Sequence, residues 1–411
     1  MPQPALHTRD DPAADAARLL LRLGIALLAL GLPCLALLTR RAVFIAFPIG
    51  AALILLSAML RAKDQAPRRF VAAIGSRVGF AALFLAGWTA LSLIWTPFFS
   101  DALDHIMRIA GTGLFTAAVA AALPRHTRTS DLYLVPIGVA AGAAFAIAIA
   151  FRAAPVTPPD IETIATPRGI ATLCVLVWPA LGALGARQHW GLASLLMLGV
   201  AAAAALNWSP VSLIALGCGS IAFAAARNDL AQVSRGLGVL AALILLCAPA
   251  LPLLADALFE ARGADTTELA RGAAAWAGVI KSDPARLLTG HGFDAAIRSV
   301  QAGFLPAATP RSLLFEIWYE LGALGALGLA ALLYLCFGAA GRAGAAAGPA
   351  LAGGLTASLI FALLGLHTTQ IWWITLLAAG IVATNMVVRG QYRTTRPLAH
   401  IAVPDGTGST Q

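Results

Sequence analysis

The feature that most constrains this chain is a succession of apolar runs, each about as long as a membrane-spanning helix. A bilayer core needs about 20 apolar residues in a helix. By this rule we expect twelve spans: 19–38, 42–60, 77–96, 103–123, 131–151, 169–186, 190–206, 209–226, 235–254, 312–339, 348–366 and 369–388. The sequence therefore predicts an all-α integral membrane protein with about twelve transmembrane helices.

Composition excludes a water-soluble protein. Only 11% of the 411 residues are charged and 59% are hydrophobic, whereas soluble domains carry about 25% charged residues. The net charge of +9 does not indicate a nucleic-acid partner, because most basic residues lie in short loops between apolar runs. The five cysteines lie inside apolar runs without metal-ligand spacing, so we expect no disulfide, metal site or cofactor.

The basic residues also predict an orientation, because Lys and Arg accumulate on the cytoplasmic side of membrane proteins. With both termini inside, the inner side holds 17 of the 28 basic residues: Arg9, Arg18, Arg22, Arg61, Lys63, Arg68, Arg69, Arg77, Arg125, Arg128, Arg187, Arg227, Arg235, Arg342, Arg389, Arg393 and Arg396. We expect a cytoplasmic tail (1–18), nine spans (19–254), a periplasmic loop with short helices (255–311), three spans (312–388) and a disordered cytoplasmic tail (389–411).

The long loop 255–311 holds the densest mixture of charged and aromatic residues. Asp265 and Glu268 form a capping-box pattern, which predicts a helix at about 266–281. Arg271 lies on this helix, which we expect at the membrane surface. There Arg271 contacts either a substrate, or an ion-pair partner or lipid headgroup.

Gly290, His291 and Gly292 predict a turn that lets the backbone approach a ligand. His291 titrates near neutral pH and is a candidate general base, although loop histidines are often structural or solvated. Asp294 then begins a second short helix, which it caps with Arg298.

Arg311 precedes Ser312, a predicted N-cap of the tenth span, and an arginine at a helix N-terminus favours a phosphate or pyrophosphate site. Glu316 and Glu320 follow on one helical face. They either pair with arginines or provide a base, because burial raises the pKa of a carboxyl group.

Arg108 and Arg168 lie near the outer ends of the fourth and sixth spans. Together with Arg298 and Arg311 they predict binding sites for the pyrophosphate of a polyanionic, lipid-linked ligand. For each arginine alone, anchoring to membrane lipid headgroups is an equal alternative. Gly322, Gly325 and Gly328 we interpret as helix-packing positions.

Four segments resemble the O-antigen ligase and polymerase superfamily: GWTALSLIWTPFFSDAL (87–103), PRGIATLCVLVWP (167–179), LLTGHGFDAAIR (287–298) and TPRSLLFEIWYELGALGA (309–326). The resemblance implies a glycosyltransferase of lipopolysaccharide and surface polysaccharide assembly in the bacterial inner membrane. Such an enzyme transfers a glycan from undecaprenyl pyrophosphate to a lipid A-core or glycan acceptor. Arg271 lies in the helix where the family places an arginine, so the resemblance implies a catalytic role for it, and His291 or Glu320 is the candidate base.

The chain departs from the family pattern at two positions. Where many members have His-Pro-His-Asn, this chain has Thr309-Pro310-Arg311-Ser312, so the histidine regarded as catalytic has no counterpart. Arginine cannot replace it as a base, because its pKa exceeds about 12. Pro210 stands where an arginine is often found.

Three functions remain open from the sequence. The first is glycosyl transfer with a relocated base. The second is a non-catalytic partner that binds lipid-linked glycan during polysaccharide assembly or export. The third, ranked last, is a secondary transporter, because the spans hold almost no ionisable residues at mid-membrane and show no paired broken helices.

Overall fold

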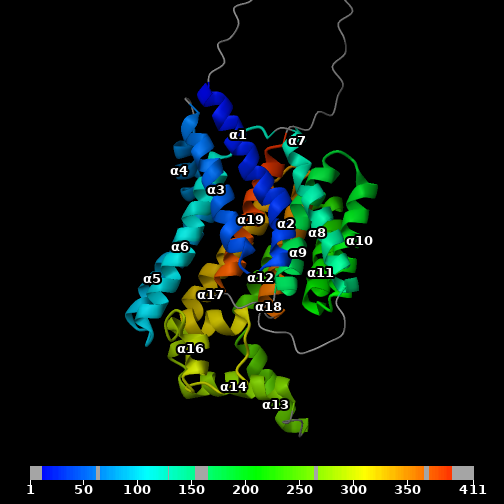
Figure 1. Ribbon diagram of the computed structural model, residues 1–411. Coiled ribbons are helices and arrows are strands. Elements are labelled where there is room, and N and C mark those ends of the chain that lie inside the picture. The colour runs from blue at the N-terminus through cyan, green and yellow to red at the C-terminus, as the bar shows by residue number, and fades with distance from the viewer. Residues whose placement is uncertain are drawn as a thin grey trace, which may run out of the picture.

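A computed structural model describes residues 12–61, 65–127, 129–152, 165–262, 267–364 and 370–390. This part of the chain is helical and contains no β-strand, apart from an isolated bridge between Thr127 and Gly390. The helices form one upright bundle, with a group of shorter helices at one end (Figure 1). Asp265 of the predicted capping box and most of the two predicted tails lie outside the described residues.

The helices follow the apolar runs in chain order. Their bounds are α1 Pro12–Ala26, a π-turn Leu27–Gly31, α2 Leu32–Leu38, α3 Ala42–Leu60, α4 Ala66–Ile74, α5 Arg77–Leu91, a 3₁₀ turn Ser92–Ile94, α6 Phe99–Ala122, α7 Thr129–Leu132, α8 Leu134–Arg152, α9 Ala165–Gly185, α10 Trp190–Leu206, α11 Pro210–Asn228, α12 Leu230–Leu246, α13 Ala250–Arg262, α14 Glu268–Ser282, α15 Arg286–Thr289, α16 Ala295–Gln301, α17 Leu313–Ala340, α18 Gly348–Leu364 and α19 Ile371–Val388.

Many of these helices match a membrane in length. In the described chain, nine helices are long and apolar enough to cross a bilayer. The α12–α13 pair meets the same test as one element bent by 61°, and α10 and α18 are shorter apolar helices. Each predicted span coincides with one of these elements. The chain is thus an all-helical, multi-pass membrane protein, and the count of twelve spans stays a prediction.

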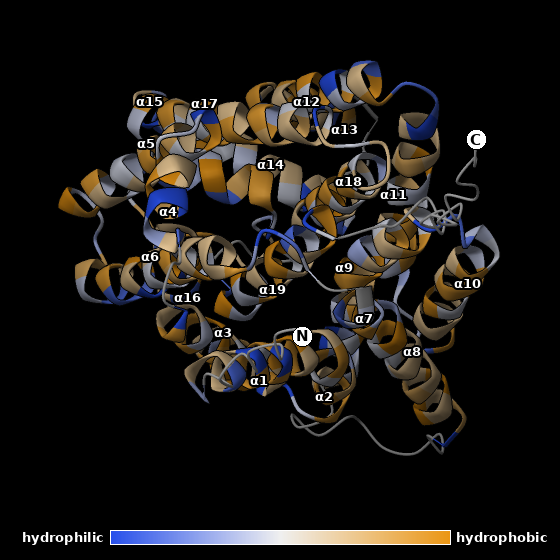
Figure 2. Ribbon diagram, turned by 90° about the horizontal axis from the view of Figure 1, so that it is seen from above, coloured by the Kyte–Doolittle hydropathy of each residue, from blue (hydrophilic) through white to orange (hydrophobic). Residues whose placement is uncertain are grey.

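The bundle is built around α9, of which 94% of the most apolar stretch is buried. Helices α2, α8, α10, α18 and α19 pack against it. Large apolar side chains on the outer helices point away from the bundle, such as Met59, Phe80 and Ile221 at 81%, 73% and 71% exposure. Figure 2 shows that hydrophobic residues dominate the bundle helices. An outer surface this apolar fits hydrocarbon rather than water.

One end of the bundle is closed by three arginines. Arg61 donates to Ala122 O, and both Arg69 and Arg389 donate to Leu123 O, at the end of α6. Guanidinium groups are favourable here, because the last carbonyls of a helix have no partner within the helix and carry partial negative charge. All three belong to the set predicted on the cytoplasmic side.

The predicted span 312–339 is not one straight helix. Gly322 has φ 62° and ψ −160°, which divides α17 into a short first segment and a longer second one. A Cβ at Gly322 would lie 2.6 Å from Leu288 O, so glycine is required by both backbone angle and space. The close packing predicted for Gly322 is present, against the backbone of Leu288, but Gly322 also breaks the helix; Gly328 packs closely against Phe84 of α5.

The predicted span 235–254 is also interrupted. It crosses the 61° bend between α12 and α13, where residues 247–249 leave the helical path. The bend frees backbone carbonyls at the end of α12, and Trp318 Nε1 donates to Leu245 O over 2.7 Å. The two interruptions meet here, because Trp318 belongs to the first segment of α17. No such pair of broken helices was expected from the sequence.

The helices of the long loop are close to prediction. Helix α14 matches the expected 266–281, with Thr267 as the N-cap whose side chain accepts from Ala270 N. Ser312 caps α17 as predicted and accepts from Phe315 N. Asp294 precedes α16 but makes no capping bond, because its carboxylate binds other groups described below.

Candidate functional site

The loop helices pack onto the first segment of α17 through a row of aromatic rings. Trp276 of α14 meets Phe315 edge-on at 5.5 Å between ring centroids. Phe315 stacks on Tyr319 at 5.3 Å, and Tyr319 stacks on His291 at 4.2 Å with an interplanar angle of 10°. These contacts bury Trp276 and Tyr319 in a core of their own. The loop is therefore fixed against the bundle.

The break in α17 is closed by hydrogen bonds from two other segments. Three consecutive carbonyls, at Tyr319, Glu320 and Leu321, accept from outside the helix. Their donors are His291 N at 2.7 Å, Gly292 N at 2.9 Å and Trp88 Nε1 at 2.9 Å. Buried carbonyls need such partners, since leaving one unpaired costs about 1–3 kcal/mol. The Gly-His-Gly turn thus holds the broken helix in place.

His291, the base predicted in the loop, lies at the edge of this core. Its Nδ1 lies 3.1 Å from Tyr319 O, which favours the tautomer with a proton on Nδ1 and leaves Nε2 as the acceptor. Burial lowers the pKa of His291, the Tyr319 carbonyl raises it, and the net direction is down. It lines a cavity of about 20 Å³ with Trp276 and Arg286, among others. A cavity of this size holds about one water molecule.

Glu320 is in the interior, at 3% exposure, and Glu316 is at 4%. The Oε1 atom of Glu320 accepts a hydrogen bond from Ala296 N, at the start of α16, over 3.1 Å. A carboxylate bound to a backbone N–H in this way anchors α16 to α17. Glu320 thereby helps to position Asp294, which lies two residues before Ala296.

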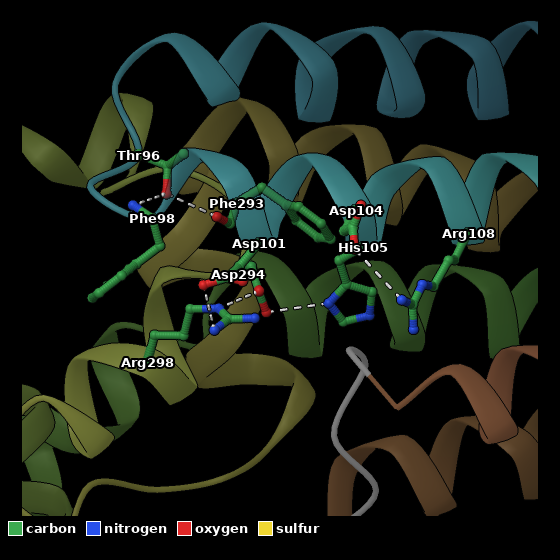
Figure 3. Close-up of polar contacts among 9 residues, drawn as sticks. All are labelled: Thr96, Phe98, Asp101, Asp104, His105, Arg108, Phe293, Asp294 and Arg298. Carbon is green, nitrogen blue, oxygen red and sulfur yellow. Dashed lines mark hydrogen bonds and ion pairs between the residues drawn. The ribbon is translucent and has the colours of Figure 1, made fainter.

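A polar pocket of about 230 Å³ lies beside this anchor, between α6, α16 and the start of α19. We call it the polar pocket; its lining consists of Asp101, Asp104, His105, Arg108, Arg298 and Ile371. Three polar side chains come from one face of α6, because Asp101, His105 and Arg108 are spaced four and three residues apart. Figure 3 shows this face directed towards Asp294 and Arg298.

Asp294 is the centre of the hydrogen-bond network in Figure 3. Its carboxylate accepts from Arg298 Nε at 2.6 Å and lies 3.2 Å from His105 Nδ1. Arg298 also donates to Asp101 at 2.9 Å. Burial acts to raise the pKa of Asp294, but the hydrogen bonds and charges of His105 and Arg298 outweigh it and lower the pKa. The carboxylate is thereby kept ionised although the residue is 1% exposed.

His105 completes a histidine–carboxylate pair. With Asp294 on Nδ1, the imidazole is held with Nδ1–H donated and Nε2 available as an acceptor. Nε2 is buried and has no hydrogen-bond partner among the described residues. The ring also packs at 5.6 Å from Phe293. A histidine oriented by a buried carboxylate is the arrangement of a general base.

Sequence reasoning missed His105. It lies inside the predicted fourth span, 103–123, whereas the candidate bases His291 and Glu320 lie in the long loop and the tenth span. One signal was available: Asp101, His105 and Arg108 share a helical face at the end of an otherwise apolar run. Ionisable residues are costly in a membrane and are kept for a partner or a function.

The arginines predicted to bind pyrophosphate are divided among separate places. Arg108 and Arg298 line the polar pocket together. Arg168 lies elsewhere, in a pocket with Arg40 and Arg41. Arg311, the fourth of this set, is exposed and lines neither pocket, and the same is true of Arg271.

No group of three or more His, Cys, Asp or Glu side chains is placed to hold a metal ion in the described part of the chain. The polar pocket itself presents a histidine, carboxylates and guanidinium groups. Comparison with models of known families found no match, and comparison with curated proteins found none either.

Proposed function

We propose that this protein is a glycosyltransferase that moves a glycan from undecaprenyl pyrophosphate to a lipid A-core or glycan acceptor, and that it does so at the polar pocket. The observation that carries the proposal is the pairing of His105 with buried Asp294, 3.2 Å apart, next to Arg108 and Arg298. Acceptor activation requires a base, and departure of the pyrophosphate requires positive charge. The pocket holds both.

The proposed reaction is a single displacement. The acceptor hydroxyl gives its proton to His105 Nε2, and its oxygen forms a bond to the anomeric carbon of the donor glycan. The bond between that carbon and the pyrophosphate oxygen breaks, and the electron pair leaves with undecaprenyl pyrophosphate. Asp294 holds the imidazole and stabilises its positive charge, while Arg108 faces the leaving group.

Arg108 is suited to this role because its own pairing is weak. It lies 3.5 Å from Asp104, one turn away, and both side chains are exposed. An exposed pair of this kind is worth about 0.3–0.5 kcal/mol. Arg108 can therefore exchange Asp104 for a phosphate at little cost, whereas Arg298 stays bound to Asp101 and Asp294.

We prefer His105 to His291 as the base because the cavity beside His105 has more room for a substrate. The cavity at His291 has room for about one water, while the polar pocket is roughly ten times larger. Glu320 and Arg271, the other two residues predicted to be catalytic, are an interior anchor and an exposed side chain. We therefore assign the proton transfer to His105 in place of these three.

The proposal includes a location. The three arginines at the end of α6 would face the cytoplasm with both termini, as the positive-inside rule predicts, and helices α13–α16 would face the periplasm of a bacterial inner membrane. Twelve spans fit this arrangement. In it, the polar pocket opens on the side where lipid-linked glycans of surface polysaccharides are assembled.

Transfer in proteoliposomes tests the proposal, with labelled undecaprenyl-pyrophosphate glycan and candidate lipid acceptors. We expect His105→Ala to lower the transfer rate by at least about 100-fold, the usual contribution of a general base. Asp294→Asn should follow the same direction. The matched control is His189→Ala, because His189 is exposed at the start of α10 and makes no capping bond.

Other outcomes would change the assignment. Full activity of His105→Ala with loss in His291→Ala would return the base to the loop, as the sequence first suggested. A wild type that binds donor without transferring it, and gains transfer in Arg311→His, would be a binding protein of polysaccharide assembly or export. That second candidate is favoured by one observation: Arg298 is already paired with two carboxylates, as in a site made for holding. Absence of donor binding would contradict both.

A further inference from the structure

A second pocket, of about 430 Å³, lies at the starts of α3 and α9. We call it the arginine pocket; it is lined by Arg40, Arg41, Phe44, Ile45 and Arg168. It is separate from the polar pocket but connected to it by α19. Ile371 lines the polar pocket, and the next residue, Trp372, contacts Arg168. The two pockets therefore share one end of the bundle.

The arginine pocket differs from the polar pocket in charge. Three guanidinium groups line it, and no carboxylate does so among the described residues. None of the three arginines forms an ion pair within that part of the chain, whereas Arg298 and Arg108 each have an acidic partner. Placing three like charges together costs energy, which an anionic ligand would recover.

Two contacts fix the guanidinium group of Arg168 within the pocket instead of leaving it extended into solvent. Its guanidinium carbon lies 5.0 Å from the ring centroid of Trp372, and its Nη1 donates to Arg40 O at 3.4 Å. Trp372 is itself buried, at 5% exposure. Stacking on a fixed ring limits the rotamers of the guanidinium, so less side-chain entropy is lost when it binds an anion.

Two apolar side chains, Phe44 and Ile45, also line the arginine pocket. Phe44 and Ile45 are 38% and 55% exposed, one turn into α3 from Arg41. With a rise of 1.5 Å per residue, they lie about 5 Å further along the α3 axis than Arg41. A ligand that fills both levels has an anionic head and a hydrocarbon chain.

We infer that the arginine pocket binds the doubly charged phosphate headgroup of a membrane lipid, a phosphomonoester or pyrophosphate, with its chain along Phe44 and Ile45. Three arginines match a dianion better than the single charge of a phosphodiester. The inference does not depend on glycosyl transfer, since it rests on charge and shape at a different pocket. Free phosphate or pyrophosphate shares the headgroup chemistry and lacks the chain.

The test measures binding of a spin-labelled phosphatidic acid to the protein in phosphatidylcholine vesicles. We expect Arg168→Gln and Arg41→Gln each to weaken binding about tenfold, the value of one charge-assisted hydrogen-bonded contact. Labelled phosphatidylglycerol, a phosphodiester, should bind wild type more weakly. The matched control is Arg152→Gln, an exposed arginine at the end of α8 that does not line the pocket.

Competition separates the two sources of phosphate. If the ligand is a lipid, free pyrophosphate displaces the labelled lipid only weakly, and Phe44→Ala lowers lipid affinity. Displacement by free pyrophosphate at the lipid's own affinity, with Phe44→Ala without effect, would overturn the lipid assignment. Unchanged binding in both arginine variants would overturn the site itself. Arg41 is exposed, so Arg41→Gln keeps the test valid if Arg168→Gln does not fold.

Discussion

At the scale of single residues, chemistry in this protein depends on partners that are distant in sequence. Asp294 and Arg298 are neighbours on α16, but the histidine that they orient comes from α6, 189 positions earlier than Asp294. A link between Asp294 and Arg298 was expected from the sequence, as the cap of a short helix. His105 was not, because no local pattern reports which helix faces a loop. The sequence alone indicated which charged residues were candidates, whereas helix packing determined that Asp294 pairs with His105.

His291 gives a prediction at this scale. Its pKa is lowered in the folded protein, by burial and by the charge of Arg286, despite the opposing Tyr319 carbonyl and Asp283. The unfolded chain therefore binds a proton first as pH falls below the ordinary value of 6.5. Stability is then lost from that pH down to the lowered pKa of the folded state.

We expect thermal unfolding in detergent to show this directly. The melting temperature of the wild type should fall on acidification below about pH 6.5, and His291→Gln should show a smaller fall from a lower starting value. His189→Gln, which alters an exposed histidine, should retain the wild-type pH dependence. An equal fall in His291→Gln would show that His291 does not titrate differently on folding.

At the scale of elements, the unexpected features are the interruptions in α17 and between α12 and α13. Mean hydropathy predicts one span across each of them, although Pro249 stands at the α12–α13 bend and Glu320 lies two residues before Gly322. Each frees carbonyls that a tryptophan indole then binds, Trp88 at Leu321 and Trp318 at Leu245. These two indole groups are hydrogen-bond donors to broken helices.

Gly322 tests the importance of the α17 break. Gly322→Ala places a Cβ 2.6 Å from Leu288 O at a positive φ. We expect a loss of about 2–4 kcal/mol, from the left-handed strain and the backbone shift together. Gly111→Ala is the matched control, because a Cβ at Gly111 in α6 meets nothing within 4 Å.

Denaturant unfolding in micelles measures both variants. In the interior of a helix, alanine is favoured over glycine by about 0.5–1 kcal/mol, so Gly111→Ala should be neutral or stabilising. If Gly322→Ala unfolded like the wild type, α17 would have to pass through this position as a continuous helix. The aromatic row and the Gly-His-Gly turn would then lack the carbonyls that hold them.

At the scale of the whole molecule, the two ends of the bundle are different. One end carries the arginines that close α6, and the other carries the polar pocket, the arginine pocket and helices α13–α16. If the proposed topology is correct, Gln301 lies outside the cytoplasm and Asp229 inside it. Both residues are exposed, so both can report on their side of the membrane.

Cysteine labelling checks this topology. In a variant free of native cysteines, Gln301→Cys should react with a membrane-impermeant maleimide in cells with a permeabilised outer membrane. Asp229→Cys should react only after the inner membrane is lysed. The reverse pattern would place the polar pocket in the cytoplasm, where it would not meet lipid-linked glycan exported for surface assembly, and the proposed function would be wrong.

The sequence alone determined the class of fold and most helix positions, because hydrocarbon requires about 20 apolar residues per span and backbone bonds satisfied within each helix. It also nominated Arg108, Arg298, His291 and Glu320, since ionisable groups are rare in such a chain. Tertiary structure decided which of these meet. It paired His105 with Asp294, moved Arg168 to a pocket of its own and placed Glu320 in the interior. The reason is physical: apolar periodicity fixes that a helix crosses the membrane, while its rotation and neighbours depend on side-chain packing among all the helices.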